Sequence, residues 1–436
     1  MSRFIAFLQP FEHANGRENR DTSTPRSAST PCRLAALLAP ALLAACGFNG
    51  TDRDEEEKQP VAESSADEMA SRDPAEGELV EVDIPDPEER PEMQLQVVLD
   101  RRGFGPGVID GAMGMSTENA LKGFQEANGL EVTGALDEET DQALARWANI
   151  PATRVVRIPE SWGGIAYREV PEEPEEQAEM NVLGYESLDE KLAERFHTTI
   201  EVLEALNPDG RPAGMEEDQP AAGSTAAPEA AGGPANPPRT RVTPTPSPTD
   251  AATGPQPIFS AGQLVRVPNI GADRLDPGGV DDEGWLLTLA SLGVGTDQPD
   301  VARIVVDKSE SWLKGYDEGG ALVAMFTVTS GSGNDPLPLG EWGVNGTAYN
   351  PPFAYDPELF WDVPDDEEKQ RLPPGPNGPV GVVWIDLTKE HYGIHGTPHP
   401  ETIGRAQSHG CVRLTNWDAA RLAGMVNGST KVLFQA

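Results

Sequence analysis

Four of the six histidines in this 436-residue sequence lie close to one of its three cysteines. His391, His395, His399 and His409 fall within nineteen residues, and Cys411 follows the last of them by two positions. Imidazole and thiol side chains pack in protein cores, bind metal ions, or act together as base and nucleophile. Each of these three roles predicts a different surrounding sequence.

A structural role is the usual one for any single histidine, and a buried cysteine behaves as a small apolar side chain. The segment SHGCVRLTNWDA around Cys411 argues for more than packing. Gly410 allows the backbone to approach a ligand closely, and cationic groups on both sides of Cys411 would lower the pKa of its thiol. The other two cysteines, Cys32 and Cys46, belong to the start of the chain.

A metal site is the second role, because His391, His395 and His399 are spaced four residues apart, as zinc ligands on a helix can be. Glycines and a proline lie between them and would break such a helix, so the three rings need not share a face. No glutamate occupies the position next to the first histidine that a metalloprotease base requires. We therefore favour catalysis and expect no metal ion.

Nucleophilic catalysis by a cysteine with a histidine base is the third role. The sequence Ile394-His395-Gly396-Thr397, followed sixteen residues after His395 by Cys411, resembles the signature of L,D-transpeptidases of the YkuD type. The upstream segments PLGEW and LPPGPNGPVG resemble the flanking sequence of that family. The resemblance spans the whole final domain.

The resemblance implies a role for each residue of the signature. Cys411 would be the nucleophile and His395 the general base, which the carbonyl of Gly396 would help to orient. Each donor to the oxyanion is typically worth roughly 3 kcal/mol. Arg413 has an alternative role as a surface salt-bridge partner. The further assignments are an oxyanion site at His409, Gly410 and the Cys411 amide, and loop-holding or substrate-binding roles for Ser408, Arg413, Gly396 and Thr397.

Such an enzyme acts on peptidoglycan stem peptides. Cys411 would attack the carbonyl of an L-centre, expected to be meso-diaminopimelate at the third stem position, and expel the terminal D-Ala to leave a thioester. The acceptor stays open among another stem, a lipoprotein lysine, a D-amino acid and water. No cofactor is implied, and carbapenem-type β-lactams should acylate the same thiol. The alternatives are a hydrolase that uses the same nucleophile to cut peptidoglycan or lipoprotein–wall links, and a non-catalytic wall-binding scaffold. His391 and His399 are interpreted as structural or rim residues.

The elements that must position these residues lie in 300–436, the predicted catalytic domain. Short apolar and β-branched runs such as VARIVV and ALVAMFTV alternate there with Gly, Asn and Asp, which is typical of strands. We expect a mostly-β domain, a β-sandwich or flattened barrel, with one helix from about Asp418 to Met425 capped by Asn416.

Residues 93–148 predict a small three-helix domain. Leu95 and Leu99 lie on one apolar helical face, Ser116 is the expected N-cap of a second helix, and a third begins at Asp137. The stretch VIDGAMGMSTENALKGFQEANGLEVTGALDEET resembles the peptidoglycan-binding domain of bacterial wall hydrolases. Its matching residues are mostly core and turn positions, so the resemblance supports the fold more than it supports binding.

Residues 180–270 predict a small α+β domain that resembles a LysM module, the strand-helix-helix-strand unit that binds N-acetylglucosamine chains. Ser187 with Glu190 forms a capping box before its first helix, and FSAGQLVRV supplies its last strand. Residues 211–258 interrupt the module with 11 Pro and no aromatic residue, so this insertion is expected to be disordered or extended. A small helical packing domain is the alternative.

The start of the chain predicts export. The apolar run LAALLAPALLAA at 34–45 follows an arginine-bearing leader and, with Cys46 directly after it, resembles a bacterial lipobox. We expect a signal peptide at 1–45, diacylation of Cys46, and a disordered acidic tether at 46–92. This predicts a periplasmic lipoprotein, with the outer membrane favoured because Gly47 has no acidic retention character. An ordinary signal peptide is the alternative.

The charge of the chain excludes nucleic acid as a partner. The 33 Lys and Arg residues oppose 72 Asp and Glu residues, a net charge of −39, which repels phosphate backbones and anionic lipid surfaces. No apolar run reaches the roughly eighteen residues of a spanning helix, so the lipid anchor is the expected link to a membrane. The expected partners are peptidoglycan stem peptides and glycan, with a lipoprotein as one candidate acceptor.

Overall fold

The structure is a computed structural model that describes residues 79–215, 257–271, 274–359, 368–406, 408 and 410–436. The predicted signal peptide, residues 46–78 of the predicted tether and most of the insertion at 211–258 lie outside these ranges. The described end of the predicted tether, 79–92, is folded and not disordered, because Val80–Val82 pairs with a strand at 153–157 and a helix begins at Pro91. Within the described ranges, every helix is too short or too polar to cross a membrane.

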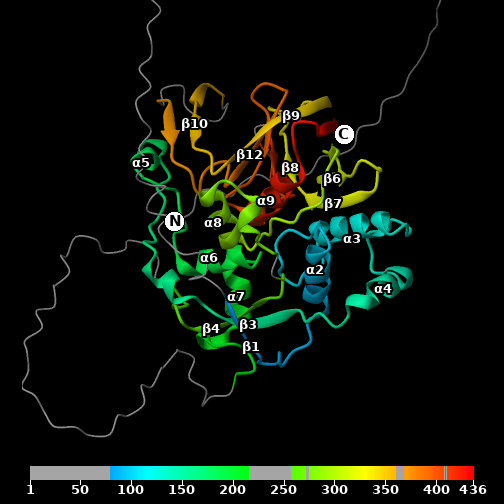
Figure 1. The fold of residues 1–436 in the computed structure, drawn as a ribbon, viewed down its shortest axis with the longest axis vertical. Coiled ribbons are helices and arrows are strands. Elements are labelled where there is room, and N and C mark those ends of the chain that lie inside the picture. The colour runs from blue at the N-terminus through cyan, green and yellow to red at the C-terminus, as the bar shows by residue number, and fades with distance from the viewer. Residues whose placement is uncertain (1–78, 216–256, 272–273, 360–367, 407, 409) are drawn as a thin grey trace, which may run out of the picture. The chain divides into compact units, whose positions relative to one another are not determined.

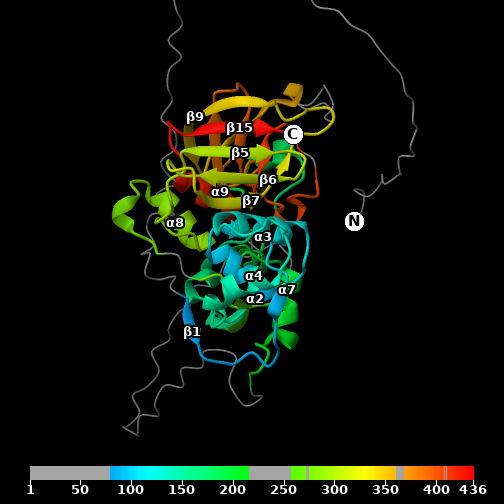
Figure 2. The same ribbon diagram turned by 90° about the vertical axis from the view of Figure 1, so that its right-hand side faces the viewer.

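A ten-stranded sheet dominates the C-terminal part of the chain, in the order β2-β7-β6-β5-β15-β9-β12-β13-β14-β8. The alternating burial of VWIDL in β12 shows why these runs form strands, since every second side chain enters the core. Figure 2 shows β9, β15, β5, β6 and β7 lying side by side. The bounds are β2 Phe104–Gly105, β5 Arg303–Asp307, β6 Trp312–Tyr316, β7 Leu322–Thr327, β8 Thr329–Ser330, β9 Gly340–Tyr349, β12 Val383–Leu387, β13 Gly393–His395, β14 Val412–Arg413 and β15 Lys431–Gln435.

Side chains from both halves of this sheet pack in one hydrophobic core. Val306 of β5 and Ile394 of β13 belong to the same cluster of buried side chains, so the sheet folds over on itself. Helix α9 (Asn416–Met425) contributes the fully buried Trp417, and α8 (Glu283–Leu292) packs against α9. The prediction of a β-rich domain with one helix near its end is therefore confirmed.

The predicted cap of that helix is wrong by one residue. The side chain of Thr415, and not that of Asn416, accepts the hydrogen bond from the backbone N–H of Asp418, at 3.1 Å. Thr415 has extended backbone angles that suit an N-cap, whereas Asn416 is the first helical residue. The Asn416 side chain is fully buried and makes other contacts.

The N-terminal region contains α2 (Pro91–Arg101), α3 (Met115–Ala127) and α4 (Glu138–Leu144). Asp137 caps α4 as predicted, by accepting from the Thr140 N–H. The predicted cap of α3 at Ser116 is wrong, because α3 starts at Met115 and its N-cap position is Gly114, two residues earlier.

Two buried glutamines explain the turn motifs of this region. Gln96 Oε1 accepts from the Gly111 N–H at 2.7 Å, and Gln125 Oε1 accepts from the Gly134 N–H at 2.8 Å. Each amide also donates to a threonine hydroxyl, at 3.1 Å for Thr117 and 2.9 Å for Thr140. Buried polar groups must be paired, so both turns are fixed by the helix that precedes them.

A second small sheet has the order β1-β3-β4 and lies beside two helices. Its strands are β1 (Val80–Val82), β3 (Thr153–Arg157) and β4 (Leu264–Pro268), and two of the helices between β3 and β4 are α6 (Leu188–Arg195) and α7 (Ile200–Leu206). Ser187 caps α6 through the Glu190 N–H, as expected. The strand that pairs with β4 thus begins near residue 153, before the predicted start of the module at 180.

The remaining described elements are short. They are α5 (Pro174–Ala178), the hairpin of β10 (Phe353–Tyr355) with β11 (Gln370–Leu372), and the 3₁₀ turns η2 Ala145–Trp147, η3 Glu160–Gly164, η4 Pro208–Gly210, η5 Pro277–Gly279, η6 Pro357–Leu359 and η7 Pro400–Thr402.

Contacts far apart in sequence join the helical region to the large sheet (Figure 1). Strand β2 pairs in parallel with β7, with Phe104 opposite Met325. Asp100 of α2 accepts two hydrogen bonds from Arg421 of α9, at 2.7 and 3.1 Å, and both residues are buried. Burial alone would raise the pKa of the Asp100 carboxyl, but the charges of Arg421 and His197 hold that pKa below its usual range.

We predict that Arg421→Met strongly destabilises the fold. Removing one partner of a buried ion pair leaves an uncompensated charge and typically costs roughly 3–5 kcal/mol. The free energy of unfolding from urea denaturation should fall by about this amount. Arg405→Met is the matched control, because Arg405 is exposed and such changes usually stay within about 0.5 kcal/mol. Equal stability of the two variants would contradict the importance of the Asp100 pair.

Candidate active site

His395 lies at the end of β13, between two neighbouring strands of the large sheet. Its antiparallel partner on β12 is Trp384, and its parallel partner on β14 is Arg413. The Trp384 ring stacks on the imidazole, with 5.4 Å between ring centroids and 21° between the planes. The side chain of His395 is therefore held between an indole on one side and a cationic residue on the other.

The pleat of these strands places Cys411 on the same face as His395. Ile394 is paired with Val412, and both side chains lie in the hydrophobic core. Because side chains alternate along a strand, the residues on either side of each point away from that core. Cys411 immediately precedes Val412 and so lies across from Gly393, diagonal to His395.

The contacts of His395 fix its tautomer. Its Nδ1 lies 2.7 Å from the carbonyl oxygen of Gly396, and because a carbonyl can only accept, Nδ1 carries the proton. Nε2 then keeps its lone pair. Burial lowers the pKa of His395 to about 3, the charge of Arg413 adds to this, and the Gly396 carbonyl opposes it. The imidazole is thus neutral near neutral pH.

Cys411 is partly exposed. The pKa of its thiol is raised, whereas the flanking cationic groups led us to expect a lowered pKa. Burial raises the pKa of the thiol, and this outweighs the lowering by the Gly393 backbone and by Arg413. In the resting state the sulfur lies 3.9 Å from the carbonyl oxygen of His391. Near neutral pH the Cys411 thiol and the His395 imidazole are therefore both neutral and do not form an ion pair.

The loop before Cys411 is held by its own backbone and by Tyr392. Ser408 Oγ donates to the carbonyl of Cys411 at 2.6 Å. Gly410 has φ +100°, and a side chain there would overlap the Tyr392 ring, so this position requires glycine. His409 lies outside the described residues.

The remaining predicted site residues differ in exposure. Thr397 is buried and accepts from the His399 N–H at 3.3 Å. The side chains of His391 and His399 are 67% and 69% exposed and each lies 3.7 Å from a glutamate, Glu390 and Glu401 respectively. Among the described residues, no three His, Cys, Asp or Glu side chains gather as a metal ion would require.

Two neighbours of the candidate pair, Cys411 and His395, went unnoticed in the sequence. Trp384 packs on His395, and Tyr392 lies close enough to Cys411 for a thiolate charge there to help raise the tyrosine pKa, after burial itself. In VVWIDL, Trp384 lies between core residues, and this alternation predicts the face of the strand from which its side chain projects. Its pairing with His395 depends on the strand register, which no local signal reveals.

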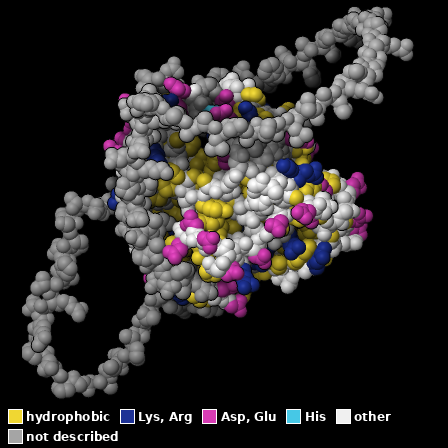
Figure 3. All heavy atoms as spheres, turned by 45° about the horizontal axis from the view of Figure 1, so that its top comes forward, with side chains coloured by type: hydrophobic (Ala, Val, Ile, Leu, Met, Phe, Trp, Pro, Cys, Tyr) yellow, Lys and Arg dark blue, Asp and Glu magenta, His cyan; other side chains and the backbone are white. Residues whose placement is uncertain are grey.

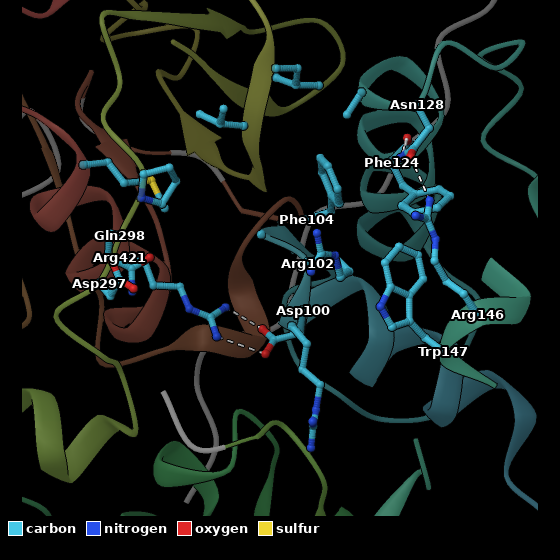
Figure 4. Close-up of a pocket in the computed structure, with 17 residues that line it drawn as sticks. Asp100, Arg102, Phe104, Phe124, Asn128, Arg146, Trp147, Asp297, Gln298 and Arg421 are labelled. Atoms are coloured by element: carbon cyan, nitrogen blue, oxygen red, sulfur yellow. Dashed lines mark hydrogen bonds and ion pairs between the residues drawn. The ribbon is translucent and has the colours of Figure 1, made fainter. Parts of the chain in front are cut away.

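A cavity of about 510 Å³ lies apart from Cys411 and His395, between α2, α3 and the end of α9. Figure 4 shows Trp147 of this cavity between Arg102 and Arg146, and the Asp100–Arg421 pair on its other side. Neither Cys411 nor His395 lines it. On the face drawn in Figure 3, acidic and basic side chains are interspersed around hydrophobic ones.

Two of the folded regions match known protein families. Residues 301–433 match the L,D-transpeptidase catalytic domain, and residues 93–144 match a putative peptidoglycan-binding domain. The chain therefore carries an L,D-transpeptidase catalytic domain together with a peptidoglycan-binding domain, and both predicted resemblances are confirmed.

Similar proteins carry the same domain name. The chain is 51% identical over 59 residues to the putative L,D-transpeptidase YkuD of Bacillus licheniformis, covering 14% of this chain and 36% of that one. It is 30% identical over 115 residues to the putative L,D-transpeptidase YqjB of Bacillus subtilis, covering 25% and 57%. An L,D-transpeptidase structure from Mycobacterium smegmatis is 23% identical, covers 31% of this chain and 58% of its own, and has a TM-score of 0.26. The chain thus spans about a third of YkuD and just over half of YqjB.

We predict that Arg413→Gln raises the pKa of both His395 and Cys411, because the Arg413 charge lowers both. Iodoacetamide alkylation of Cys411 should rise with pH without a plateau near neutrality, and the variant should need still higher pH. The measurement uses protein with Cys32→Ser and Cys46→Ser, which leaves Cys411 as the reacting thiol. A rate plateau between about pH 5 and 8 would instead indicate a thiolate–imidazolium pair.

Proposed function

We propose that this protein is a cysteine L,D-transpeptidase that remodels peptidoglycan. Cys411 is the nucleophile and His395 the general base. The substrate is the third-position L-centre of a tetrapeptide stem, from which D-Ala is released, and the acyl group passes to an amine acceptor. The catalytic-domain match and the peptidoglycan-binding-domain match support this substrate class.

One observation carries the proposal. Cys411 directly precedes β14, His395 ends the parallel strand β13, and the register puts both on the same side of the sheet, while His395 Nδ1 donates to the Gly396 carbonyl. This leaves Nε2 as the basic nitrogen of His395. A general base needs both an available lone pair and a position near the proton that it removes.

Acylation begins from the neutral pair. As the Cys411 sulfur bonds to the stem carbonyl carbon, its proton moves to His395 Nε2 and the carbonyl oxygen becomes an oxyanion. The backbone N–H groups of Gly410 and Cys411, with His409, are the proposed oxyanion donors. The tetrahedral intermediate then breaks its C–N bond, His395 returns the proton to the leaving D-Ala nitrogen, and a thioester remains on Cys411.

Deacylation reverses these proton movements. The acceptor amine attacks the thioester carbonyl, gives its proton to His395 Nε2, and forms a new amide as the C–S bond breaks. The proton on His395 then restores the Cys411 thiol. The buried site and the Arg413 charge disfavour imidazolium, so the protonated base returns its proton readily and no net charge accumulates between steps.

The other signature residues have supporting roles in this proposal. Ser408 holds the loop by donating to the Cys411 carbonyl. Arg413 attracts the carboxylate of the stem in addition to tuning the two pKa values, and Gly396 and Thr397 form the adjoining edge of the substrate site. The LysM-like module is proposed to bind the glycan of the wall, since the helices α6 and α7 lie between its paired strands β3 and β4.

We predict that Cys411→Ala abolishes release of D-Ala from a purified tetrapeptide-stem substrate. His395→Gln should slow the reaction by roughly 10²–10⁴-fold, the usual contribution of a general base. His399→Gln is the control and should keep its rate, because that ring is exposed. Undiminished turnover by Cys411→Ala would refute the mechanism.

Mass spectrometry of the products, with and without an added amine acceptor, identifies the second half-reaction. New amide products that require the amine are the result expected for a transpeptidase. Tripeptide stems formed regardless of the amine would indicate a hydrolase that uses the same nucleophile. Binding to sacculi without any thioester on Cys411 after carbapenem treatment would indicate a scaffold.

We further propose that Cys46 is diacylated and that the protein is a periplasmic lipoprotein of the outer membrane. In a Gram-negative host that exports it, Cys46→Ala should move the protein from the membrane pellet to the soluble periplasmic fraction and prevent labelling by a tagged fatty acid. Cys32→Ala is the matched control and should change neither property. Continued lipid labelling of Cys46→Ala would contradict the proposal.

A further inference from the structure

Asn416 connects two parts of the chain that lie far apart in sequence. It begins helix α9 and is fully buried. Its Nδ2 donates to Glu194 Oε1 of α6 at 2.6 Å and to the Pro376 carbonyl at 3.1 Å, while its Oδ1 accepts from the Val382 N–H at 3.3 Å. All three contacts leave the α9 helix and reach other segments.

The Asn416 side chain also contacts Gly396, whose carbonyl orients His395. A methyl group placed on Gly396 would overlap Asn416 Oδ1, and so would one placed on Gly381. The Asn416 amide therefore sits in direct contact with Gly396, in space that only glycine leaves open. The carbonyl of Gly396 accepts the Nδ1 proton of His395 at 2.7 Å, so a shift of this peptide would turn the imidazole.

Glu194 keeps the Asn416 side chain in place from the α6 side. It is 8% exposed, and its partners include the amide of Asn416 and Tyr185. Without the Glu194 acceptor the Asn416 amide would lose its shortest hydrogen bond. A buried amide with an unmet donor rotates or shifts to find another partner, because leaving it unpaired is costly.

The α6 segment, residues 183–195, is docked on the catalytic domain by a second set of contacts. Asn377 Nδ2 donates to Glu190 Oε1 at 2.7 Å and to the Gly184 carbonyl at 3.0 Å, and its backbone N–H donates to the Leu183 carbonyl at 3.0 Å. None of these reaches Gly396. The same interface thus contains one buried amide, that of Asn416, next to the Gly396 peptide, and one half-buried amide, that of Asn377, remote from it.

We propose that Asn416 and Glu194 are positioning residues for His395, so that docking of the α6 segment holds the catalytic base in its productive orientation. The inference rests on the proposed role of His395. It adds that a residue outside the catalytic domain, Glu194, acts on the site through Asn416 and the Gly396 peptide. Neither side chain touches substrate in this proposal.

The test compares Asn416→Ala and Glu194→Leu with Asn377→Ala in the full chain. We expect the first two to lower kcat by roughly 10–100-fold with KM little changed, since small displacements of a catalytic group cost this much. Asn377→Ala removes comparable docking hydrogen bonds and should lower stability alone. Glu194→Gln keeps an acceptor for Asn416 and should restore near-normal kcat. Equal kcat for Asn377→Ala and Asn416→Ala, both folded by circular dichroism, would overturn the proposal.

A second readout does not depend on turnover. ¹⁵N NMR of labelled histidine in the native protein should show His395 protonated on Nδ1, and Asn416→Ala and Glu194→Leu should shift or broaden that signal while Asn377→Ala leaves it unchanged. An unaltered His395 signal in Asn416→Ala would refute the coupling. If the native protein showed this signal but no transpeptidation, the proposed function would fail while the coupling stood.

Discussion

The parallel pairing of β13 with β14 is the constraint on which the site depends. It sets Ile394 and Val412 into one core and so turns His395 and Cys411 toward the opposite face. A slip of one residue in either strand would bury the imidazole or the thiol among apolar side chains. The core of the domain and the geometry of its proposed chemistry are therefore specified by the same hydrogen bonds.

Burial also sets the electrostatics of the pair. It raises the pKa of the Cys411 thiol and lowers the pKa of the His395 imidazole, so both groups are neutral near neutral pH. Arg413 favours the thiolate but opposes imidazolium. In the proposed mechanism the proton is therefore transferred during attack on the carbonyl, and the free protein stores no thiolate that oxidants could reach.

The modules of the chain are joined through buried polar groups as well as apolar packing. Arg421 with Asp100 links α9 to α2, and Asn416 with Glu194 links the same helix to α6. Buried polar groups require their partners, so these contacts specify one arrangement more strictly than apolar contacts would. Helix α9 thereby connects the helical region, the α6 segment and the loop beside the site.

The signature containing His395 and Cys411, the β-rich character of the last domain, and the caps at Asp137 and Ser187 could all be predicted from the sequence, because each depends on local residue types and spacing. The helix cap at Thr415, the raised thiol pKa and the contact of Asn416 with Gly396 could not. The cap depends on the backbone angles at the helix start, and the other two depend on burial and on the packing of α9 and the strands around the site. Only the tertiary structure determines which groups lose water and which neighbours they gain.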